Sequence, residues 1–138
     1  MFLANSAGWP AATLYDPHHA PGHPQGLHVD SDALLGSFAD LDAQGAQWLK
    51  EQHVDVRDLG LVCVHQPSVP FVDTFRSRMD IDPAQIIPTF PHTGNAAAAT
   101  LPLQLATAAG RGRLAEGDTV ALFGLASGAS GAVMLLRW

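Results

Sequence analysis

The chain has 138 residues, which is the size of one ordinary domain and enough to bury a hydrophobic core. Hydrophobic residues make up 47 % of it and charged residues only 14 %. We therefore expect a globular protein, part of whose surface is covered by another chain or by the rest of a larger protein. The formal net charge of -6, without any basic run, excludes a nucleic-acid-binding surface.

Three features bear on the cellular location. Cys63 is the single cysteine, so an internal disulfide is excluded and a reducing cytoplasm is favoured. The first residues have neither a basic start nor a long apolar core, so a signal peptide is not expected. Residues 119–136 carry no charge and contain a GxxxG spacing, as a membrane helix would. Their Gly- and Ser-rich centre instead favours a hairpin of two strands, over 119–123 and 132–136. We expect a cytoplasmic protein without a membrane span.

The N-terminal part is predicted to be an irregular lead-in, rich in Pro, Gly and His, over residues 1–27 of a single domain spanning 1–138. Its prolines and glycines exclude a long element but allow a short strand over residues 2–4. His18, His19 and His23 resemble metal ligands. No second ligand cluster follows at zinc spacing, however, so we predict a solvated loop and no metal site.

The first long element predicted is an amphipathic helix from Asp32 to Lys50. Asp30 or Ser31 is expected to cap its N-terminus. The apolar positions that form one stripe along this helix are Leu34, Phe38, Leu41, Gly45 and Trp48.

A buried strand and a second helix follow. The continuous apolar run Leu59–Val64 is typical of a strand covered on both faces in an α/β protein. Ser68 is expected to cap the second helix, with Pro70 tolerated in its first turn. The side of this helix that should be buried consists of Val69, Val72, Phe75 and Met79.

The remaining elements complete the pattern. Asp82 and Pro83 predict a short turn or helix, and a proline places the extended segment 86–90 at a sheet edge or strand end. A third helix is expected from Ala96 to Ala109, bent at Pro102. A polar loop then leads into the terminal hairpin. This alternation of strands and helices predicts an α/β fold with a mixed sheet and packed helices.

Two polar residues stand at the ends of predicted elements. His65 follows the buried strand directly, and Asn95 follows Gly94 at the start of the third helix. Each residue also has a purely structural explanation. A histidine at the end of a buried strand is often a core residue whose hydrogen bonds are made within the protein, and an asparagine at a helix start often caps the helix. Both side chains donate hydrogen bonds, and the fold could bring them together. Their joint placement makes them the candidate site.

Several motifs in fixed order resemble one family. They are His65-Gln66, then Gly94-Asn95 thirty residues on, the run Leu101–Leu105, Gly117-Asp118, and a Gly/Ser-rich hairpin ending in Arg137-Trp138. Over roughly residues 26–138 this pattern resembles the C-terminal half of β-ketoacyl-acyl-carrier-protein synthase III, a thiolase-like condensing enzyme. The resemblance implies a thiolase-like C-terminal fold.

The resemblance also implies an activity. In this family a cysteine takes an acyl group from a thioester, while a histidine and an asparagine bind the carbonyl of a malonyl thioester that loses carbon dioxide. His65 and Asn95 would have these two roles, and backbone N–H groups at Ser127 and Gly128 would hold the oxyanion of the acyl-cysteine. The implied enzyme is an acyltransferase of fatty-acid or polyketide-type biosynthesis. It uses acyl-CoA or acyl-carrier-protein thioesters and no tightly bound cofactor.

The sequence departs from the family pattern in three ways. The family's nucleophilic cysteine lies in an N-terminal half that is absent here, and Cys63 would be buried in mid-strand with a neutral thiol. We therefore expect a partner, either an N-terminal Cys-bearing half or a second chain, in a dimeric assembly. Ser68 and Pro70 stand where the family has an asparagine and an arginine that meets the carrier or coenzyme. Ala126 and Ser127 stand where it often has glycines, which narrows the allowed backbone angles.

Two other functions remain open. The chain could be a non-catalytic structural subunit or fragment that keeps the motifs for packing. The complete enzyme could also transfer an acyl group to an alcohol or amine without decarboxylation. Asn95 favours condensation, because a general base at that position would be better served by a carboxylate.

Overall fold

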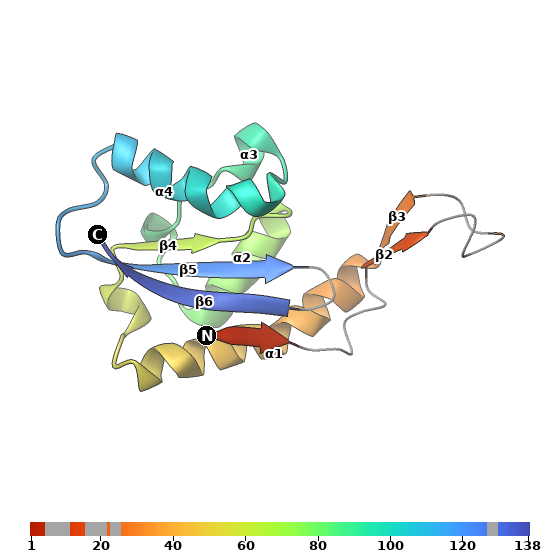
Figure 1. The fold of residues 1–138 in the computed structure, drawn as a ribbon, viewed down its shortest axis with the longest axis horizontal. Helices are drawn as coiled ribbons and strands as arrows, with labels where there is room; N and C mark the ends of the chain where they lie inside the picture. Colours follow the sequence, from red (N-terminus) through yellow and green to blue (C-terminus); the bar gives the residue numbers. More distant parts are fainter. Residues whose placement is uncertain (5–11, 16–21, 23–25, 127–129) are drawn as a thin grey trace.

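The structure is a computed structural model, which describes residues 1–4, 12–15, 22, 26–126 and 130–138 (Figure 1). Its strands are β1 (Phe2–Ala4), β2 (Ala12–Tyr15), β3 (Gly26–Val29), β4 (Leu61–Val64), β5 (Thr119–Ala126) and β6 (Ser130–Arg137). Its α-helices are α1 (Ser31–Glu51), α2 (Val69–Met79), α3 (Phe90–Thr93) and α4 (Thr100–Gly110). Short 3₁₀ turns are η2 (Val56–Asp58), η3 (Pro83–Gln85) and η4 (Ala97–Ala99).

Four strands form a mixed sheet in the order β1-β6-β5-β4. β5 and β6 form the predicted antiparallel hairpin, β4 runs parallel to β5, and β1 pairs antiparallel with β6. The mixed α/β fold expected from the sequence is therefore confirmed. β2 and β3 form a separate antiparallel pair, which extends away from the main sheet in Figure 1.

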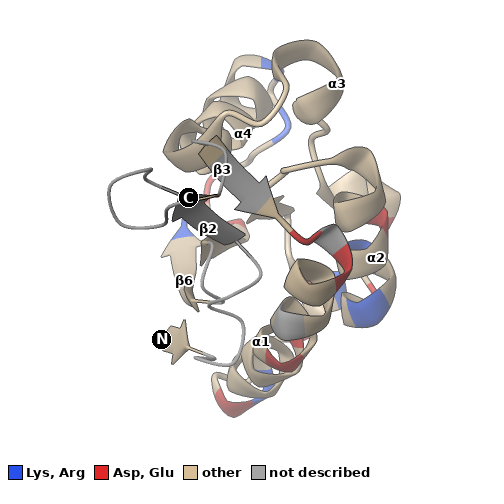
Figure 2. Cartoon of the chain, turned by 90° about the vertical axis from the view of Figure 1, so that its right-hand side faces the viewer, with Lys and Arg blue, Asp and Glu red and all other residues tan. Residues whose placement is uncertain are grey.

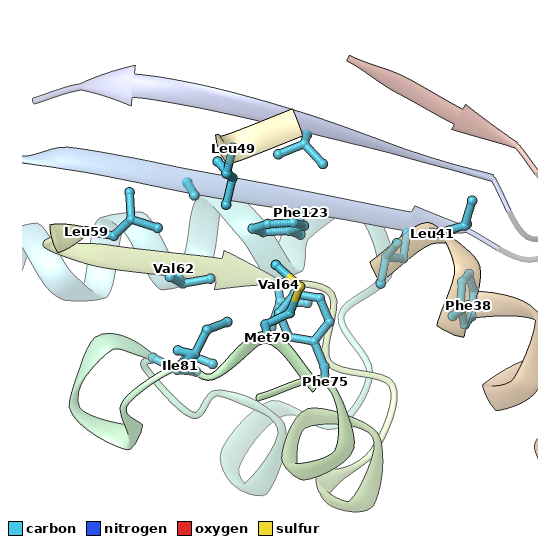
Figure 3. Packing of buried hydrophobic residues seen from close by; sticks show 14 of the residues in the cluster. Phe38, Leu41, Leu49, Leu59, Val62, Val64, Phe75, Met79, Ile81 and Phe123 are labelled. Atoms are coloured by element: carbon cyan, nitrogen blue, oxygen red, sulfur yellow. The ribbon is translucent and has the colours of Figure 1, made fainter. Parts of the chain in front are cut away.

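Helices cover the sheet on both faces, with α1 and α2 on one side and α4 on the other (Figure 1). The larger core lies under α1 and α2, where Phe75 packs edge-on against Phe123 with ring centroids 5.1 Å apart (Figure 3). Gly45 allows α1 to approach β5 closely, because a Cβ atom there would lie 2.9 Å from the Phe123 ring. The predicted apolar stripe of α1 therefore includes this glycine as a packing position.

A smaller core lies between the sheet and α4. Leu61 and Cys63 of β4 belong to this core, whereas Val62 and Val64 belong to the larger one. This alternation buries every residue of β4, as predicted for a strand covered on both faces. The strand begins at Leu61, two residues later than expected.

The caps of the first two long helices match the sequence. Asp30 accepts a 3.0 Å hydrogen bond from the Ala33 N–H at the start of α1, and Ser68 accepts one of 3.2 Å from the Phe71 N–H at the start of α2. Pro70 lies in the first turn of α2. The prediction that Val69 belongs to the buried side of α2 is wrong, because Val69 is exposed. The buried residues of α2 are Phe71, Phe75 and Met79.

Three other predictions need correction. The lead-in contains the strands β2 and β3, which the sequence did not indicate. Residues 86–89 belong to no strand and Phe90 already begins α3, so the expected edge or strand end is wrong. The third helix is divided into η4 and α4. Pro102 then lies in the first turn of α4, where a missing N–H breaks no helical hydrogen bond and no bend is needed.

The apolar stretch considered as a membrane helix forms β5 and β6. Within the part of the chain that the structure describes, no helix is long and apolar enough to cross a membrane.

Candidate functional site

His65 stands immediately after β4. Its N–H donates a 3.2 Å hydrogen bond to the Phe123 carbonyl, which continues the pairing of β4 with β5 beyond the strand. Strand alternation places its side chain on the same face as Cys63, toward α4. The imidazole is half-buried at this end of the sheet.

Asn95 is positioned by the turn that ends α3. Gly94 has a φ of +65°, a left-handed conformation that favours glycine and redirects the chain after the helix. The Asn95 Oδ1 atom then accepts a 2.9 Å hydrogen bond from the Ala97 N–H. Because the carbonyl end of the amide is held in this way, the NH₂ end of the side chain remains available to donate.

One pocket of about 340 Å³ brings His65 and Asn95 together. Its other lining residues are Ala97, Ala98, Leu101, Gly124, Leu125 and Ala126. No charged side chain is among these described residues. The pocket is therefore small, mostly apolar and equipped with two side chains that donate hydrogen bonds.

The environment of His65 favours the neutral imidazole. Burial lowers the pKa of His65 below its ordinary value, and a hydrogen bond with the backbone of Ala97 acts in the opposite direction. Ala97 thus contacts both polar groups of the pocket. Its own φ is +48°, which an alanine rarely adopts.

The two expected oxyanion residues, Ser127 and Gly128, lie outside the described residues. The preceding residues Gly124, Leu125 and Ala126 end β5 and line the pocket. His18, His19 and His23 also lie outside the described part. Among the residues that are described, no group of three or more His, Cys, Asp or Glu is arranged to hold a metal ion.

Cys63 is fully buried and does not line the pocket. Burial raises the pKa of its thiol to about 12. The thiol is therefore protonated at neutral pH, which agrees with the expectation that Cys63 is not a nucleophile.

Two buried glutamines beside His65 were not identified as site residues from the sequence. Gln66 follows His65 directly. Gln104, on α4, forms a hydrogen bond with Val64, the strand residue that precedes His65. The available signal was a polar residue inside an apolar helical run, as in Leu103-Gln104-Leu105. A buried amide must find hydrogen-bond partners, so such a residue is expected to bridge elements.

Solved structures of similar shape define the class of the fold. The chain matches a variant of OleA from Xanthomonas campestris with a TM-score of 0.87 at 24 % sequence identity, over 100 % of this chain and 39 % of that one. It matches 3-oxoacyl-(acyl carrier protein) synthase III, FabH, from Pseudomonas aeruginosa PAO1 with a TM-score of 0.84 at 19 % identity, over 100 % and 43 %. The class is that of the thiolase-like α/β proteins.

Comparison of the sequence itself gives the family. The model described as 3-Oxoacyl-[acyl-carrier-protein (ACP)] synthase III C terminal matches residues 49–138, which is more than half of the chain. The chain belongs to this family, and the resemblance seen in its motifs is confirmed.

Curated relatives agree with this assignment. A β-ketoacyl-[acyl-carrier-protein] synthase III from Rhizobium johnstonii is 40 % identical over 81 residues, and one from Clostridium tetani is 29 % identical over 90 residues. These matches cover 59 % and 65 % of this chain but only 25 % and 27 % of the relatives. The matched part thus spans about a quarter of the curated relatives.

Proposed function

We propose that the chain is the His/Asn-bearing C-terminal part of a synthase III-type condensing acyltransferase. The reaction would be the decarboxylative Claisen condensation of an acyl thioester with a malonyl thioester, in fatty-acid or polyketide-type biosynthesis. The observation that carries this proposal is the shared pocket of His65 and Asn95 in a chain of this family.

The pocket suits the charge that develops during decarboxylation. When the malonyl group loses carbon dioxide, negative charge moves onto the thioester carbonyl oxygen as an enolate forms. A neutral imidazole has one N–H, which bonds the backbone of Ala97 in this chain, so His65 would turn it to the substrate oxygen on binding. Hydrogen bonds from His65 in that position and from the Asn95 amide would stabilise this charge more than they stabilise the starting ester. One such donor is typically worth about 2.7–4 kcal/mol of the barrier. Asn95, Ala97, Ala98 and Ala126 are exposed in this chain, so the proposed partner would have to exclude water from the pocket before a dry site could strengthen both bonds.

The remaining bond changes need a second reactive group. The C–C bond to the carboxylate breaks and releases carbon dioxide, and its electron pair becomes the enolate. The enolate carbon then attacks the carbonyl of an acyl group held as a cysteine thioester, and the cysteine leaves as thiolate. Cys63 cannot hold that acyl group, because it is buried and lies outside the pocket. The nucleophile would come from an N-terminal half or from a second chain.

An uncovered apolar surface supports such a partner. Phe2 of β1 pairs with Ala132, and Met134 pairs with Leu122, so these side chains share the sheet face on which α4 lies. Phe2 is 92 % exposed and Met134 62 % exposed. We call Phe2, Leu122, Ala132 and Met134 the open face. The adjoining helix α4 has no charged residue, whereas α1 and α2 carry many (Figure 2).

The carrier of the substrates is a separate part of the proposal. Acyl-CoA or acyl carrier protein would deliver the thioesters, and no tightly bound cofactor is required by the chemistry. At the start of α2, Ser68 and Pro70 offer no positive charge to a phosphate group. A dimeric assembly in the cytoplasm is the proposed setting.

A first experiment asks whether the chain has its partner. Native mass spectrometry of the protein from its source, combined with iodoacetamide labelling, should detect an assembly that contains a fast-reacting cysteine other than Cys63. A stable species that contains only this chain, with an unreactive thiol, would leave a non-catalytic fragment or structural subunit.

A second experiment measures carbon dioxide release from malonyl-CoA and from malonyl carrier protein by the assembled enzyme. His65→Ala and Asn95→Ala should each reduce it by at least about 100-fold. His92→Ala is the matched control, because this exposed histidine on α3 does not line the pocket. Activity retained in both pocket variants would overturn the catalytic role. Acyl transfer to an alcohol or amine without carbon dioxide release would overturn condensation.

A further inference from the structure

Two buried glutamines hold the chain on either side of His65. Gln104, on α4, contacts Val64, the residue that precedes His65. Its Nε2 donates to the Val64 carbonyl at 2.7 Å and to the Thr100 carbonyl at 3.1 Å, and its Oε1 accepts from the Val64 N–H at 3.3 Å. Both backbone groups of Val64 are thus bound by one side chain that is itself 0 % exposed.

Gln66 binds the segment that leads to Asn95. Its Nε2 donates to the Ile87 carbonyl at 2.9 Å. Its Oε1 accepts from the Thr89 N–H at 2.8 Å, from the Thr89 hydroxyl at 3.2 Å and from the Phe90 N–H at 3.1 Å. The start of α3 is therefore fixed to the residue that follows His65, and α3 ends two residues before Asn95.

The position of β4 explains why side chains are needed here. β4 is the last strand of the four-stranded sheet, so no described strand pairs with its outer edge. A buried backbone group without a partner costs about 1–3 kcal/mol. The Gln104 amide bonds to Val64 as a neighbouring strand would. It thereby holds α4, whose Leu101 lines the pocket, to the end of β4.

We propose that Gln66 and Gln104 are positioning residues that fix His65 relative to Asn95 and to the wall of the pocket. Neither side chain lines the pocket, so each acts through the backbone beside His65. The catalytic meaning of this arrangement rests on the proposed function. The positioning itself does not, and it can be tested without the activity.

Gln85 provides a matched control. It is also a buried glutamine, and its Nε2 donates to the Val56 and Leu59 carbonyls at 2.7 Å each. These contacts lie at the opposite end of β4 from His65. Loss of the Gln85 amide should therefore cost stability, as loss of Gln66 or Gln104 does, without moving the imidazole.

The test compares Gln66→Met, Gln104→Met and Gln85→Met in the full 138-residue chain. Methionine keeps the length of the side chain and removes its hydrogen bonds. The titration of His65 is followed by NMR of the imidazole. In the two site variants the ring should gain water, so its pKa should rise toward the ordinary value. In Gln85→Met it should stay at the wild-type value.

A fourth variant covers the case in which the methionine variants do not fold. Gln66→Glu keeps an oxygen that accepts from Thr89 and Phe90, so this variant should fold and keep slow exchange of the Thr89 amide. Slow exchange of the Thr89 and Val64 amides in the wild-type chain is a second expected result. A His65 titration unmoved in both site variants, or fast exchange at both amides, would overturn the proposal.

In the assembled enzyme, Gln66→Met and Gln104→Met should lower kcat by on the order of 100-fold with little change in KM, because a displacement of about 1 Å costs that much. Gln85→Met should leave kcat near wild type at a temperature where it is folded. If His65→Ala retains carbon dioxide release, the proposed function fails. If His65 shifts only in the two site variants, the positioning still holds.

Discussion

At the scale of single residues, Ala97 has an unusual backbone. Its φ of +48° is left-handed, and its side chain is exposed, so no packing contact explains the conformation. A left-handed residue with a Cβ atom costs roughly 1–2 kcal/mol. Its N–H holds Asn95 and its backbone contacts His65, so the strain coincides with the place where the two polar groups meet.

This strain can be measured with two valine variants. Ala97→Val should lower the unfolding free energy by about 1–2 kcal/mol more than Ala99→Val, since a β-branched residue tolerates positive φ poorly. Ala99 is the control because it is also exposed and has an ordinary φ of −78°. Chemical denaturation measures both. Equal losses in the two variants would show that Ala97 is not strained.

Asp42 is a second unusual residue, far from the pocket. It is buried between α1 and α2, its Oδ2 accepts a 3.3 Å bond from Arg78, and its Oδ1 has no hydrogen-bond partner. Burial raises the pKa of Asp42 to about 6, and the hydrogen bond and charge of Arg78 only partly oppose this. The folded state therefore binds this proton more tightly than the unfolded state, in which the pKa is near 3.8.

The sign of the pH dependence follows. The stabilisation from a protonated Asp42 is complete below about pH 4 and is lost as the pH rises through about 6, by roughly 2–3 kcal/mol. Asp42→Asn removes this titration. Denaturation at about pH 4.5 and about pH 7.5 should show the variant gaining stability relative to wild type at the higher pH. A stability difference that is the same at both values would contradict the raised pKa.

The sequence predicted the two polar residues of the pocket but not what holds them. His65 and Asn95 follow recognisable elements, and the order of motifs relates them to a family. Gln66 and Gln104 bind backbone atoms of residues 23 and 40 positions away in sequence. Such contacts depend on the packed arrangement of α3 and α4, which local patterns do not contain.

At the scale of elements, α2 carries the chain away from the pocket, and its start is fixed by Ser68. The hydroxyl group accepts from the Phe71 N–H, and Pro70 needs no N–H partner in the first turn. Ser68→Ala should lower the unfolding free energy by about 1 kcal/mol, whereas Ser68→Asp should keep the cap. Chemical denaturation would measure this. A loss in Ser68→Asp as large as in Ser68→Ala would contradict the capping role.

Elements whose apolar residues recur with a regular period along the sequence were predictable, and elements that depend on tertiary contacts were not. The long stripe and the cap of α1 appear directly in the sequence. The late start of α4 does not, because the left-handed φ of Ala97 is incompatible with an α-helix at that residue and no local pattern indicates it. β2 and β3 were missed because each has four residues and they lie among prolines and glycines.

At the scale of the whole molecule, the low charge of the sequence is unevenly distributed. Helices α1 and α2 together carry eight of the 20 charged residues, while α4 and the open face carry none (Figure 2). A large exposed apolar area in a single chain marks an interaction site. The composition alone predicted that a surface would be covered, and the sheet register places the exposed Phe2 and Met134 together on one candidate surface.

This surface gives the last prediction. Met134→Lys places a charge at the centre of the open face, where a partner that buries it would leave the ammonium group unpaired. The variant should fold as stably as wild type, since Met134 is 62 % exposed in the chain alone. Its assembly with the proposed Cys-bearing partner should weaken by at least about 100-fold, as expected for a buried charge that costs several kcal/mol.

Val69→Lys is the control for this experiment. Val69 is also an exposed apolar residue, at 45 %, but it belongs to α2 on the other side of the sheet. Native mass spectrometry of each variant mixed with the partner measures assembly, and thermal unfolding measures stability. If Met134→Lys assembles as well as Val69→Lys, the partner does not cover the open face. If assembly fails only in Met134→Lys, the half that supplies the cysteine packs beside α4, on the side of the sheet toward which His65 points.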